Sequence, residues 1–409
     1  MTNTTQIDKQ SNNWQIKKIE DIAEVVGGGT PSTKNPDNFG GEISWITPKD
    51  LSEHKDRYIG RGERSLTKQG LDNSSAKILP PNTVLLSSRA PVGYTAISAN
   101  ELCTNQGFRS MIPKKDISSE YLYYLTKANT HVFESNASGS TFKELSGGRL
   151  KKLSFLIAPE SEQKEIAFVL SSLDDKIELN RKVNQTLEAI GKALFRQWFV
   201  DFEFPNEEGK PYKSSGGEMV DSELGEIPEG WEVVEVGRYL EILDSQRVPL
   251  SRRERAKRQG DFRYYGATGV IDHVNDYLFD GIYLLIGEDG TVVGESGRPY
   301  TQYVWGKFWA NNHAHVLQGK PPFSTEYMKL FFDNIRIKPY ITGAVQPKLN
   351  QGNLKSIPLL VSPKSLLSDF QKYIETLFAL TRNNEEQINN LEKARDSLLP
   401  RLISGKLRV

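Results

Sequence analysis

Cysteine is almost missing from this chain, because Cys103 is the only one among 409 residues. A lone cysteine excludes an intrachain disulfide and favours a reducing compartment. No stretch approaches the roughly 18 consecutive apolar residues that a membrane-spanning helix needs, and the first residues lack the apolar core of an export signal. We therefore expect a cytoplasmic protein without a membrane segment.

Catalytic and cofactor-binding motifs are missing as well. Every Gly-Lys pair lacks the Ser or Thr that would complete a phosphate-binding P-loop, and the Gly27–Thr30 run lacks the glycine spacing of a dinucleotide turn. No Gly-x-Ser-x-Gly elbow, His-Glu-x-x-His helix or Cys-x-x-Cys pair occurs. His313 and His315 alternate along one expected strand, but no further zinc ligands stand nearby. We expect no catalytic residue, metal or cofactor in this chain.

Excess charge of either sign is also lacking, since 52 basic and 52 acidic residues balance to zero. This balance disfavours a uniformly basic nucleic-acid binder. One local run is basic, however, with Arg252, Arg253, Arg255, Lys257 and Arg258 opposed mainly by Glu254. Such a run can neutralise DNA phosphates, or it can be an ordinary solvated surface.

The dominant feature that is present is a repeat. Residues 153–159 (LSFLIAP) and 357–363 (IPLLVSP) each close a Gly-rich region and open a long helical segment. Matched positions in the last third of each copy differ by 204 residues, as 363 minus 159 shows. A unit of this size is a whole domain plus a helix. We predict an α+β fold, with two β-rich globular heads separated by two long antiparallel helices in a coiled-coil-like, pseudo-two-fold repeat.

The helical segments carry matching apolar seams. Apolar residues recur at steps of four and three from residue 162 to 199, and again 204 residues later. About 40 residues at 1.5 Å each predict rods of roughly 60 Å. A stripe of this kind can also face a globular core, but the flanking regions are β-like, so the simplest partner of each stripe is the other. The expected spacer-helix contacts are Leu173, Ile177, Asn180, Leu187, Leu377, Asn384, Ile388 and Leu391.

Asn180 and Asn384 interrupt the two seams at matching positions. Because equivalent residues meet where two antiparallel helices cross, we expect these two asparagines to pair and fix the register.

Local patterns divide the chain into five parts. The first head is expected at 1–158, the first spacer helix at 159–203, an exposed and mobile linker at 204–224, the second head at 225–362, and the second spacer helix with a C-terminal segment at 363–409. Expected strands are 43–46, 83–87, 94–97 and 108–112 in the first head and 262–265, 282–286, 291–293 and 313–317 in the second. Short helices are expected at 120–128 and 326–333.

A degenerate nuclease-like pattern occurs in the first head. Asp37 follows a proline, and Glu53 and Lys55 follow with the spacing in which two carboxylates hold Mg²⁺ and a lysine stabilises charge. The second head has no copy of this pattern.

Several segments, taken in order, resemble the specificity subunits of type I restriction-modification systems. They are residues 28–32 (GGTPS), the Arg89 and Glu288 turn segments, Pro159-x-x-x-Gln163, residues 225–231 (GEIPEGW) and residues 398–407 (LLPRLISGKL). Each segment alone is weakly specific, but their order and duplication cover nearly the whole chain.

The resemblance implies that each head is a target recognition domain for one half of a bipartite site in double-stranded DNA. The helices would fix the spacing between the two halves. Partner subunits would do the chemistry. Two modification subunits would bind S-adenosylmethionine and flip adenine, and a restriction subunit would use ATP and Mg²⁺. The chain itself would be no enzyme.

Candidate DNA-contacting residues follow from how side chains recognise bases, with Arg for guanine and Asn or Gln for adenine. Each could instead make an ordinary surface hydrogen bond. In the first head they are Thr47, Lys49, Arg89, Gln106, Arg109, Thr141 and Lys143. In the second head they are Arg252, Arg253, Arg263, Tyr265, Asn311, Asn312, His313, Gln346 and Lys348. A standalone Mg²⁺-dependent nuclease and a scaffold that binds no DNA remain alternatives.

Overall fold

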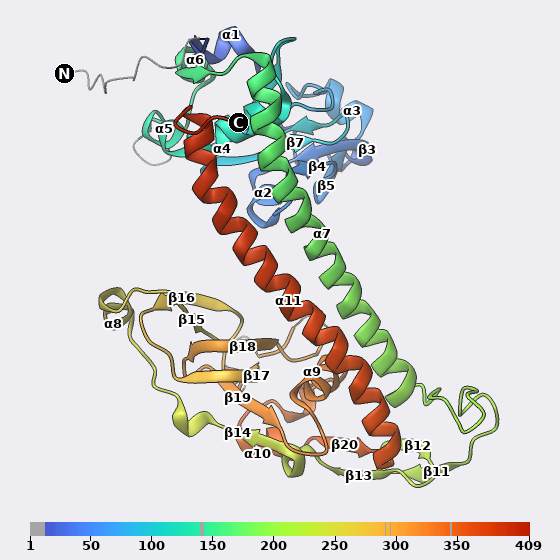
Figure 1. Ribbon diagram of the computed structural model, residues 1–409. Coiled ribbons are helices and arrows are strands. Elements are labelled where there is room, and N and C mark those ends of the chain that lie inside the picture. The colour runs from blue at the N-terminus through green and yellow to red at the C-terminus, as the bar shows by residue number, and fades with distance from the viewer. Residues whose placement is uncertain (1–12, 140–142, 291, 295, 344–345) are drawn as a thin grey trace. The chain divides into compact units, whose positions relative to one another are not determined.

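The computed structural model describes residues 13–139, 143–290, 292–294, 296–343 and 346–409. They form two compact units: the chain up to Asn180 together with Glu386–Val409, and Arg181–Glu385. Each unit contains one β-rich head and parts of two long helices, α7 (Glu160–Phe199) and α11 (Lys364–Ile403) (Figure 1). The predicted α+β fold is confirmed. Among the described residues, no helix combines the length and the apolar character needed to cross a membrane.

The first head contains a five-stranded sheet in the order β2-β9-β6-β7-β4 and a three-stranded sheet in the order β5-β3-β8. The pair β1–β10 stands apart from both sheets. The elements are β1 (Gln15–Lys18), α1 (Ile19–Ile22), β2 (Ala23–Gly27), η1 (Pro36–Asn38), β3 (Phe39–Ile46), α2 (Pro48–Glu53), β4 (Tyr58–Ile59), β5 (Arg64–Leu66), α3 (Lys68–Asp72), β6 (Val84–Ser88), β7 (Val92–Ser98), β8 (Cys103–Thr104), β9 (Arg109–Pro113), α4 (Ser119–Ala128), α5 (Thr130–Ser135), α6 (Gly147–Lys152) and β10 (Ser154–Ile157).

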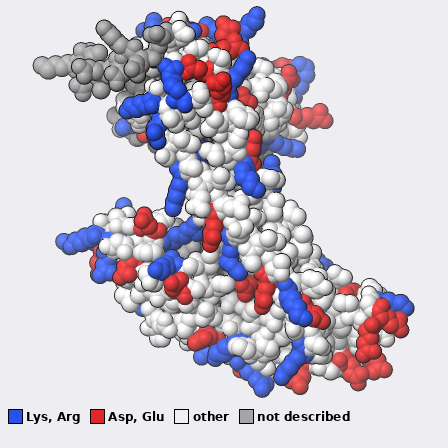
Figure 2. Space-filling view, in the orientation of Figure 1, with Lys and Arg blue, Asp and Glu red and all other residues white. Residues whose placement is uncertain are grey.

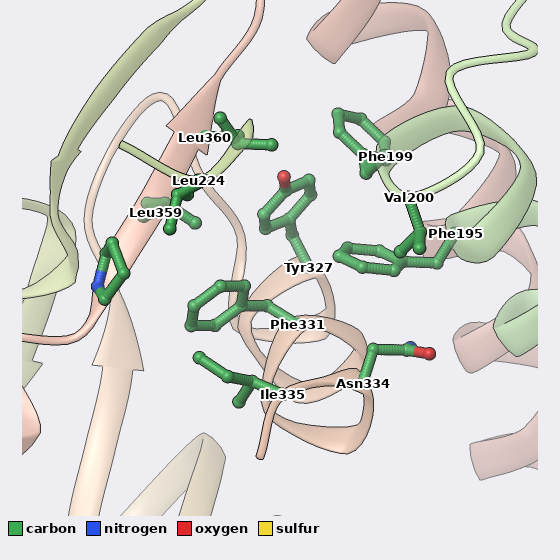
Figure 3. Close-up of a pocket in the computed structure, with 11 residues that line it drawn as sticks. Phe195, Phe199, Val200, Leu224, Tyr327, Phe331, Asn334, Ile335, Leu359 and Leu360 are labelled. Atoms are coloured by element: carbon green, nitrogen blue, oxygen red, sulfur yellow. The ribbon is translucent and has the colours of Figure 1, made fainter. Parts of the chain in front are cut away.

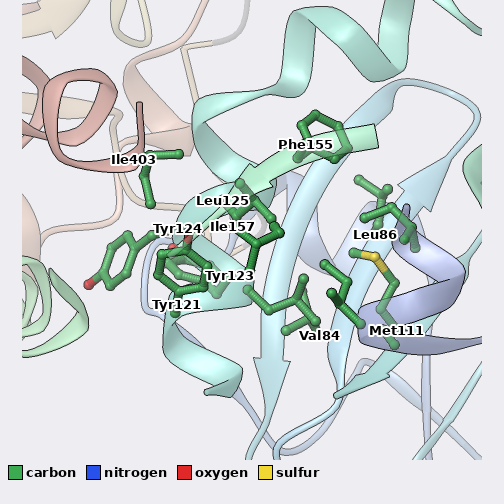
Figure 4. Close-up of a cluster of buried hydrophobic side chains, with 14 of the residues drawn as sticks. Val84, Leu86, Met111, Tyr121, Tyr123, Tyr124, Leu125, Phe155, Ile157 and Ile403 are labelled. Carbon is green, nitrogen blue, oxygen red and sulfur yellow. The ribbon is translucent and has the colours of Figure 1, made fainter. Parts of the chain in front are cut away.

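The core of the first head lies between its larger sheet, α4 and the end of α11. Figure 4 shows Val84 and Met111 of the sheet facing Tyr121 of α4, with Ile403 of α11 nearby. Ser118 caps α4 by accepting a hydrogen bond from the Tyr121 amide, which explains why the helix begins there.

The second head contains a six-stranded sheet in the order β14-β19-β17-β18-β15-β16, in which β15 and β18 run parallel. The pairs β13–β20 and β11–β12 lie outside this sheet. The elements are β11 (Met219–Ser222), β12 (Gly225–Pro228), β13 (Glu232–Glu235), η2 (Val236–Tyr239), β14 (Leu240–Ile242), η3 (Asp244–Gln246), α8 (Arg252–Lys257), β15 (Phe262–Tyr265), β16 (Val270–Val274), β17 (Phe279–Gly287), β18 (Thr301–Ala310), β19 (Ala314–Gly319), α9 (Thr325–Asn334), η4 (Lys338–Tyr340), α10 (Gln351–Lys355) and β20 (Pro358–Val361).

Most of the strands and both short helices that we predicted are confirmed, with ends shifted by a few residues. The strand expected at 291–293 is wrong, because Val293 makes only an isolated bridge with Pro299. Thr291 lies outside the described residues.

The connection between α7 and the second head is folded rather than extended. Strands β11 and β12 pair as a hairpin. The ring of Phe204 stacks on Tyr212 at 4.5 Å between centroids and on Trp231 at 5.4 Å. These aromatic contacts hold the segment at Phe204 and Tyr212, while most of its polar residues remain exposed, as expected from the sequence.

An apolar pocket lies in the second unit where the end of α7 meets α9 and β20. Its volume is about 230 Å³, and Phe195, Phe331 and Leu360 are among the residues that line it (Figure 3). The lining offers few polar groups, chiefly the Tyr327 hydroxyl and the Asn334 amide. The pocket therefore lacks the cluster of charges that would hold a nucleotide or a metal ion.

Within each unit the two long helices run antiparallel. In the first unit, Arg395 of α11 donates to Asp174 of α7 at 2.6 Å, and Asn180 donates to Gln387 at 3.2 Å, so the numbering rises on one helix as it falls on the other. In the second unit, Asn384 donates to Asn184 at 2.8 Å, and the Trp198 and Phe370 rings lie 5.5 Å apart.

The expected pairing of Asn180 with Asn384, which belong to different units, stays a prediction. Within its own unit, Asn180 donates to Gln387, and Asn384 donates to Asn184. These partners lie three or four positions further along the helices, about one turn, because facing side chains of packed helices interdigitate rather than meet at identical heights.

The other expected seam residues are at least partly buried. Ile177 and Ile388 are buried, and Leu173, Leu187, Leu377 and Leu391 are half-buried.

Ion pairs and hydrogen bonds also connect each head to the long helices of its own unit. In the first unit, Arg57 reaches α7, where it donates to Asp175 at 2.5 Å and to the Ser171 carbonyl at 3.3 Å. In the second unit, Arg382 of α11 donates to Glu326 of α9 at 3.1 Å. The Arg57 side chain is 7% exposed, so this contact holds the first head to α7 in one orientation.

The seam can be tested by comparing two residues of α7 that face opposite ways. Ile177→Ala removes a buried side chain and should lower the free energy of unfolding by about 2–5 kcal/mol. Leu179→Ala, at a position that is 52% exposed, should change it by less than about 0.5 kcal/mol. Denaturant titration of the purified chain measures both values. Equal losses would show that the seam is not the buried face.

Candidate nucleic-acid interface

The two heads share one backbone arrangement near the loop that precedes each long helix. In the first head, Asn105 accepts a hydrogen bond from the Gly107 amide at 2.9 Å, and the Ser88 amide donates to the Gly107 carbonyl at 2.7 Å. In the second head, Asn311 accepts from the His313 amide at 2.9 Å, and the Glu288 amide donates to the His313 carbonyl at 2.8 Å.

The following loops match in the same way. Ser138 bridges Glu144 in the first head, and Thr342 bridges Lys348 in the second. The Leu145 amide then donates to the Ser88 carbonyl, and the Leu349 amide donates to the Glu288 carbonyl. We call the described residues of 88–89, 105–109 and 138–144 the first loop surface. Those of 288–289, 311–315 and 342–348 are the second loop surface.

The first loop surface brings together three of the predicted residues. Glu144 pairs with Arg109 at 2.8 Å and with Arg89 at 3.7 Å. Gln106, which is exposed, accepts a hydrogen bond from the Thr30 hydroxyl. Arg109 also donates to the Phe108 carbonyl at 2.7 Å, so most of its guanidinium is used inside the head. Among the described residues, the one interaction of the Arg89 guanidinium is its ion pair with Glu144 at 3.7 Å, which leaves it the better placed of the two arginines for an external acceptor.

Thr47 and Lys49 lie on the segment beside this surface. The Asn105 amide donates to the Ile46 carbonyl at 3.0 Å. Thr47 caps α2 by exchanging hydrogen bonds with Asp50, which is a structural role. Lys49 is exposed and pairs with Glu63 at 2.7 Å. That hydrogen bond raises the pKa of Lys49 above its usual value. Lys143 is also exposed, and Thr141 lies outside the described residues.

The second loop surface carries different side chains on the same backbone. His313 pairs with Asp289 at 2.5 Å, and Lys348 pairs with Glu288 at 3.3 Å. Asn311 is buried and shapes the turn, whereas Asn312 and Gln346 are exposed. Asn312 and Gln346 are therefore amides that this surface exposes to solvent.

The charges of two matched residues are reversed in sign between the heads. An acidic residue, Glu144, stands on the loop of the first head, and Lys348 stands at the matching place in the second. The neighbouring strand end carries Arg89 in the first head and Asp289 in the second. An arginine favours acceptors such as guanine O6 and N7, whereas a carboxylate favours donors such as cytosine N4. The two surfaces thus present opposite hydrogen-bonding chemistry.

The basic run predicted from the sequence lies at α8. Ser251 caps α8 in a capping box with Glu254. Arg252 and Arg253 are exposed, and Figure 2 shows basic side chains gathered over this part of the second head. Arg255 is used internally, donating to Asp272 at 2.8 Å. Arg252 and Arg253 are therefore the residues of α8 best placed to meet a phosphate.

Two further predicted residues lie on β15, beside α8. Arg263 is exposed. Tyr265 is 7% exposed and packs edge-on against Phe308 at 5.6 Å, so its ring belongs to the core rather than to the surface.

Asp244, Arg247, Glu288 and His315 form a buried network behind the second loop surface that the sequence did not reveal. Potential ligand atoms of Asp244, Glu288 and His315 lie within 4.8 Å of one another. Both nitrogens of His315 already have partners in the protein, Asp244 at 2.6 Å and the Leu349 carbonyl at 2.7 Å. Arg247 donates to Glu288 at 2.8 Å. These bonds fit a network of ion pairs rather than a metal centre. One sequence signal could have pointed to His315. It follows Asn311 by four residues, just as Arg109 follows Asn105 in the first head.

The residues of the nuclease-like pattern lie in separate elements. Asp37 is in η1, where its carbonyl accepts a hydrogen bond from Thr67 at 2.7 Å. Glu53 ends α2, and Lys55 follows that helix. Neither loop surface contains any of them.

Comparison with known proteins identifies the class. Residues 11–189 and 228–393 match the family described as the type I restriction modification DNA specificity domain. The chain therefore belongs to the family of type I restriction-modification specificity subunits, whose members are not catalytic.

Individual relatives agree with this assignment. The chain is 38% identical to the type I restriction enzyme MjaIX specificity subunit of Methanocaldococcus jannaschii, over 99% of this chain and 96% of that protein. It is 26% identical to the putative MjaX specificity subunit of the same organism, over 99% and 96%. Its fold resembles the crystal structure of a type I S subunit from M. genitalium, with a TM-score of 0.58 and 15% identity over 98% of this chain and 99% of that one.

The different duties of the two arginines can be separated by mutation. Arg109→Ala removes hydrogen bonds to Phe108 and Glu144 from a half-buried site, so it should lower the free energy of unfolding by about 1–3 kcal/mol. Arg89→Ala, with a single long ion pair, should change it by less than about 0.5 kcal/mol. Thermal or chemical unfolding of both variants measures the difference. A large loss for Arg89→Ala would assign that residue to the structure of the head.

Proposed function

We propose that this chain recognises a bipartite site in double-stranded DNA, with each loop surface reading one half. The observation that carries the proposal is the matched pair of surfaces. The hydrogen bonds that the side chains of Asn105 and Asn311 accept from the backbone are the same in both heads, at 2.9 Å, while the exposed side chains around them differ in charge and chemistry. Two different half-sites can be read by two domains that share the same loop backbone and carry different exposed side chains.

Within this proposal, direct readout falls to the freest side chains of each surface. Arg89 and Gln106 serve the first half-site, and Asn312, His313 and Gln346 serve the second. Lys49, Lys143, Arg263 and Lys348 supply positive charge close to the duplex, since phosphate contacts position a protein without reading sequence.

The partners in this proposal are two modification subunits and a restriction subunit. The partners bind the methyl donor S-adenosylmethionine and the ATP and Mg²⁺ used for cleavage. This chain determines which DNA sequence the assembly binds. Such an assembly would act in the cytoplasm, where the DNA is. Relatives named as specificity subunits along nearly their whole length support this division.

The two arginines of α8 are proposed to contact phosphates near the second half-site. Replacing Arg252 and Arg253 together with alanine should weaken binding to every sequence alike. It should also reduce the slope of log affinity against log salt by about 0.9 for each phosphate that the variant no longer neutralises. The assembled complex is titrated with duplex DNA at several salt concentrations. Lys372→Ala, at an exposed lysine of α11 that pairs with Asp369, is the control and should leave the slope unchanged.

The spacing role of α7 and α11 is tested by lengthening them together. Inserting seven residues after Gln185 and seven after Asn389 keeps the seam in phase and adds roughly 10 Å to each helix. This corresponds to about three base pairs. Mapping methylated adenines in cells that carry the assembled system should show the same half-sites further apart.

An insertion in α7 alone is the matched control, because it puts the seam out of register and should abolish methylation. Changed half-site sequences after the double insertion would contradict the proposal. So would DNA cleavage by the purified chain with Mg²⁺ that Asp37→Ala abolishes.

A further inference from the structure

His315 and Asp244 form an ion pair deep in the second head. The His315 side chain is 0% exposed and that of Asp244 is 4% exposed. His315 Nδ1 lies 2.6 Å from Asp244 Oδ2, and His315 Nε2 lies 2.7 Å from the Leu349 carbonyl. A carbonyl oxygen only accepts hydrogen bonds, and so does a carboxylate, so both ring nitrogens must donate. The ring is therefore bonded as its doubly protonated, positively charged form.

Charged groups from three neighbouring segments surround this ring. Asp244 belongs to η3, and Arg247, just after η3, lies 3.4 Å from it. Glu288 follows β17 and lies 3.7 Å from His315. Lys348, on the loop before α10, pairs at 3.3 Å with Glu288 Oε1, the carboxylate oxygen other than the one that lies near His315.

Asp244 itself is held in its charged form. Burial raises the pKa of Asp244, but hydrogen bonds with His315 and the Val316 amide outweigh burial and leave the pKa below its ordinary value. Asp244 therefore remains an acceptor for His315.

The network ends at the second loop surface. His315 holds the Leu349 carbonyl, and the Leu349 amide donates to the Glu288 carbonyl at 2.9 Å. Gln351, the first residue of α10, donates to Asp244 at 2.7 Å. If the ring loses one proton, either the Leu349 or the Asp244 hydrogen bond is broken. Loss of the Leu349 bond releases the loop that carries Gln346 and Lys348 from β19, and loss of the Asp244 bond separates β19 from the carboxylate that also holds Gln351.

The first head has a different pair at the same place. Arg109 follows Asn105 by four residues, as His315 follows Asn311. Gly27 is the residue of the first head that matches Asp244. Each lies four residues after the first residue of its strand, Ala23 of the Ala23–Pro113 pair in the first head and Leu240 of the Leu240–Gly319 pair in the second. A Cβ on Gly27 would lie 3.7 Å from Arg109 Nη1, so the guanidinium lies beside Gly27, as His315 lies beside Asp244. Arginine keeps its charge across the working pH range, whereas histidine does not.

We propose that His315 is a positioning residue that makes recognition of the second half-site depend on pH, while Arg109 makes recognition of the first half-site independent of it. Discrimination at the second half-site weakens as pH rises, because the uncharged ring cannot hold both Asp244 and Leu349. This inference rests on the proposed function of the two loop surfaces.

The experiment uses the chain assembled with its modification subunits. Binding is measured to the full site and to duplexes with one base pair changed in either half-site, between about pH 5 and about pH 8, the range in which histidine ordinarily changes charge. Discrimination at the second half-site should fall about tenfold, as expected when one charge-assisted hydrogen bond is broken, and discrimination at the first should stay constant. Parallel profiles for both half-sites would overturn the inference. Loss of discrimination at both half-sites at every pH would instead overturn the proposed function.

The chain supplies its own matched variant. Replacing Asp244→Gly and His315→Arg together reproduces the Gly27–Arg109 pair of the first head and should make the second half-site insensitive to pH. A pH profile that stays as steep as the wild type would place the proton elsewhere and overturn the role of His315. Should the double variant unfold, which a melting curve shows, the wild-type comparison of the two half-sites still decides the question.

Discussion

Burial of the apolar seam between α7 and α11 is the interaction on which both units depend. Neither head closes its own core, since Ile403 of α11 completes the first, and Phe195 and Phe199 of α7 complete the second. Helix packing and head folding are therefore one process in each unit. The ion pairs of Arg57 and Arg382 then orient each head on its helices. A recognition surface mounted in this way has a defined direction relative to the helix that carries it.

Sequence reasoning succeeded where a local period carries the information. The seams, both short helices and most strands follow from spacing of apolar residues, because burial of one face repeats every 3.6 or 2 residues. The duplication was also visible, since matched segments kept a constant offset. These features predict two heads and two rods without any knowledge of long-range contacts.

Contacts between distant residues were the part that the sequence could not supply. Asp244 and His315 are 71 residues apart and meet only because β14 pairs with β19. Tyr265 looked like a surface aromatic, but its strand lies inside a sheet of six. The partner of Asn180 within its own unit, Gln387, depends on the stagger between two helices. In each case the role of a side chain depends on a contact with a residue distant in the sequence, and local sequence patterns do not predict such contacts.

The two loop surfaces share the same backbone hydrogen-bond arrangement but expose side chains of different charge and hydrogen-bonding character. The side chains of Asn105 and Asn311 each accept a hydrogen bond from a backbone amide and hold the turn, so the exposed side chains around them can vary while the turn is kept. Each head still has an ion pair between this loop and the neighbouring strand end, Glu144 with Arg89 in the first and Lys348 with Glu288 in the second. Stability is conserved while the groups offered to the solvent change.

The division of the first unit between two distant parts of the chain has a consequence for synthesis on the ribosome. Its core includes Leu399, Leu402 and Ile403, and the Trp14 ring lies against Gly405. A nascent chain therefore carries an unfinished first head until residues 399–405 emerge from the exit tunnel. A product that stops before them exposes apolar surface, which is what chaperones and proteases bind.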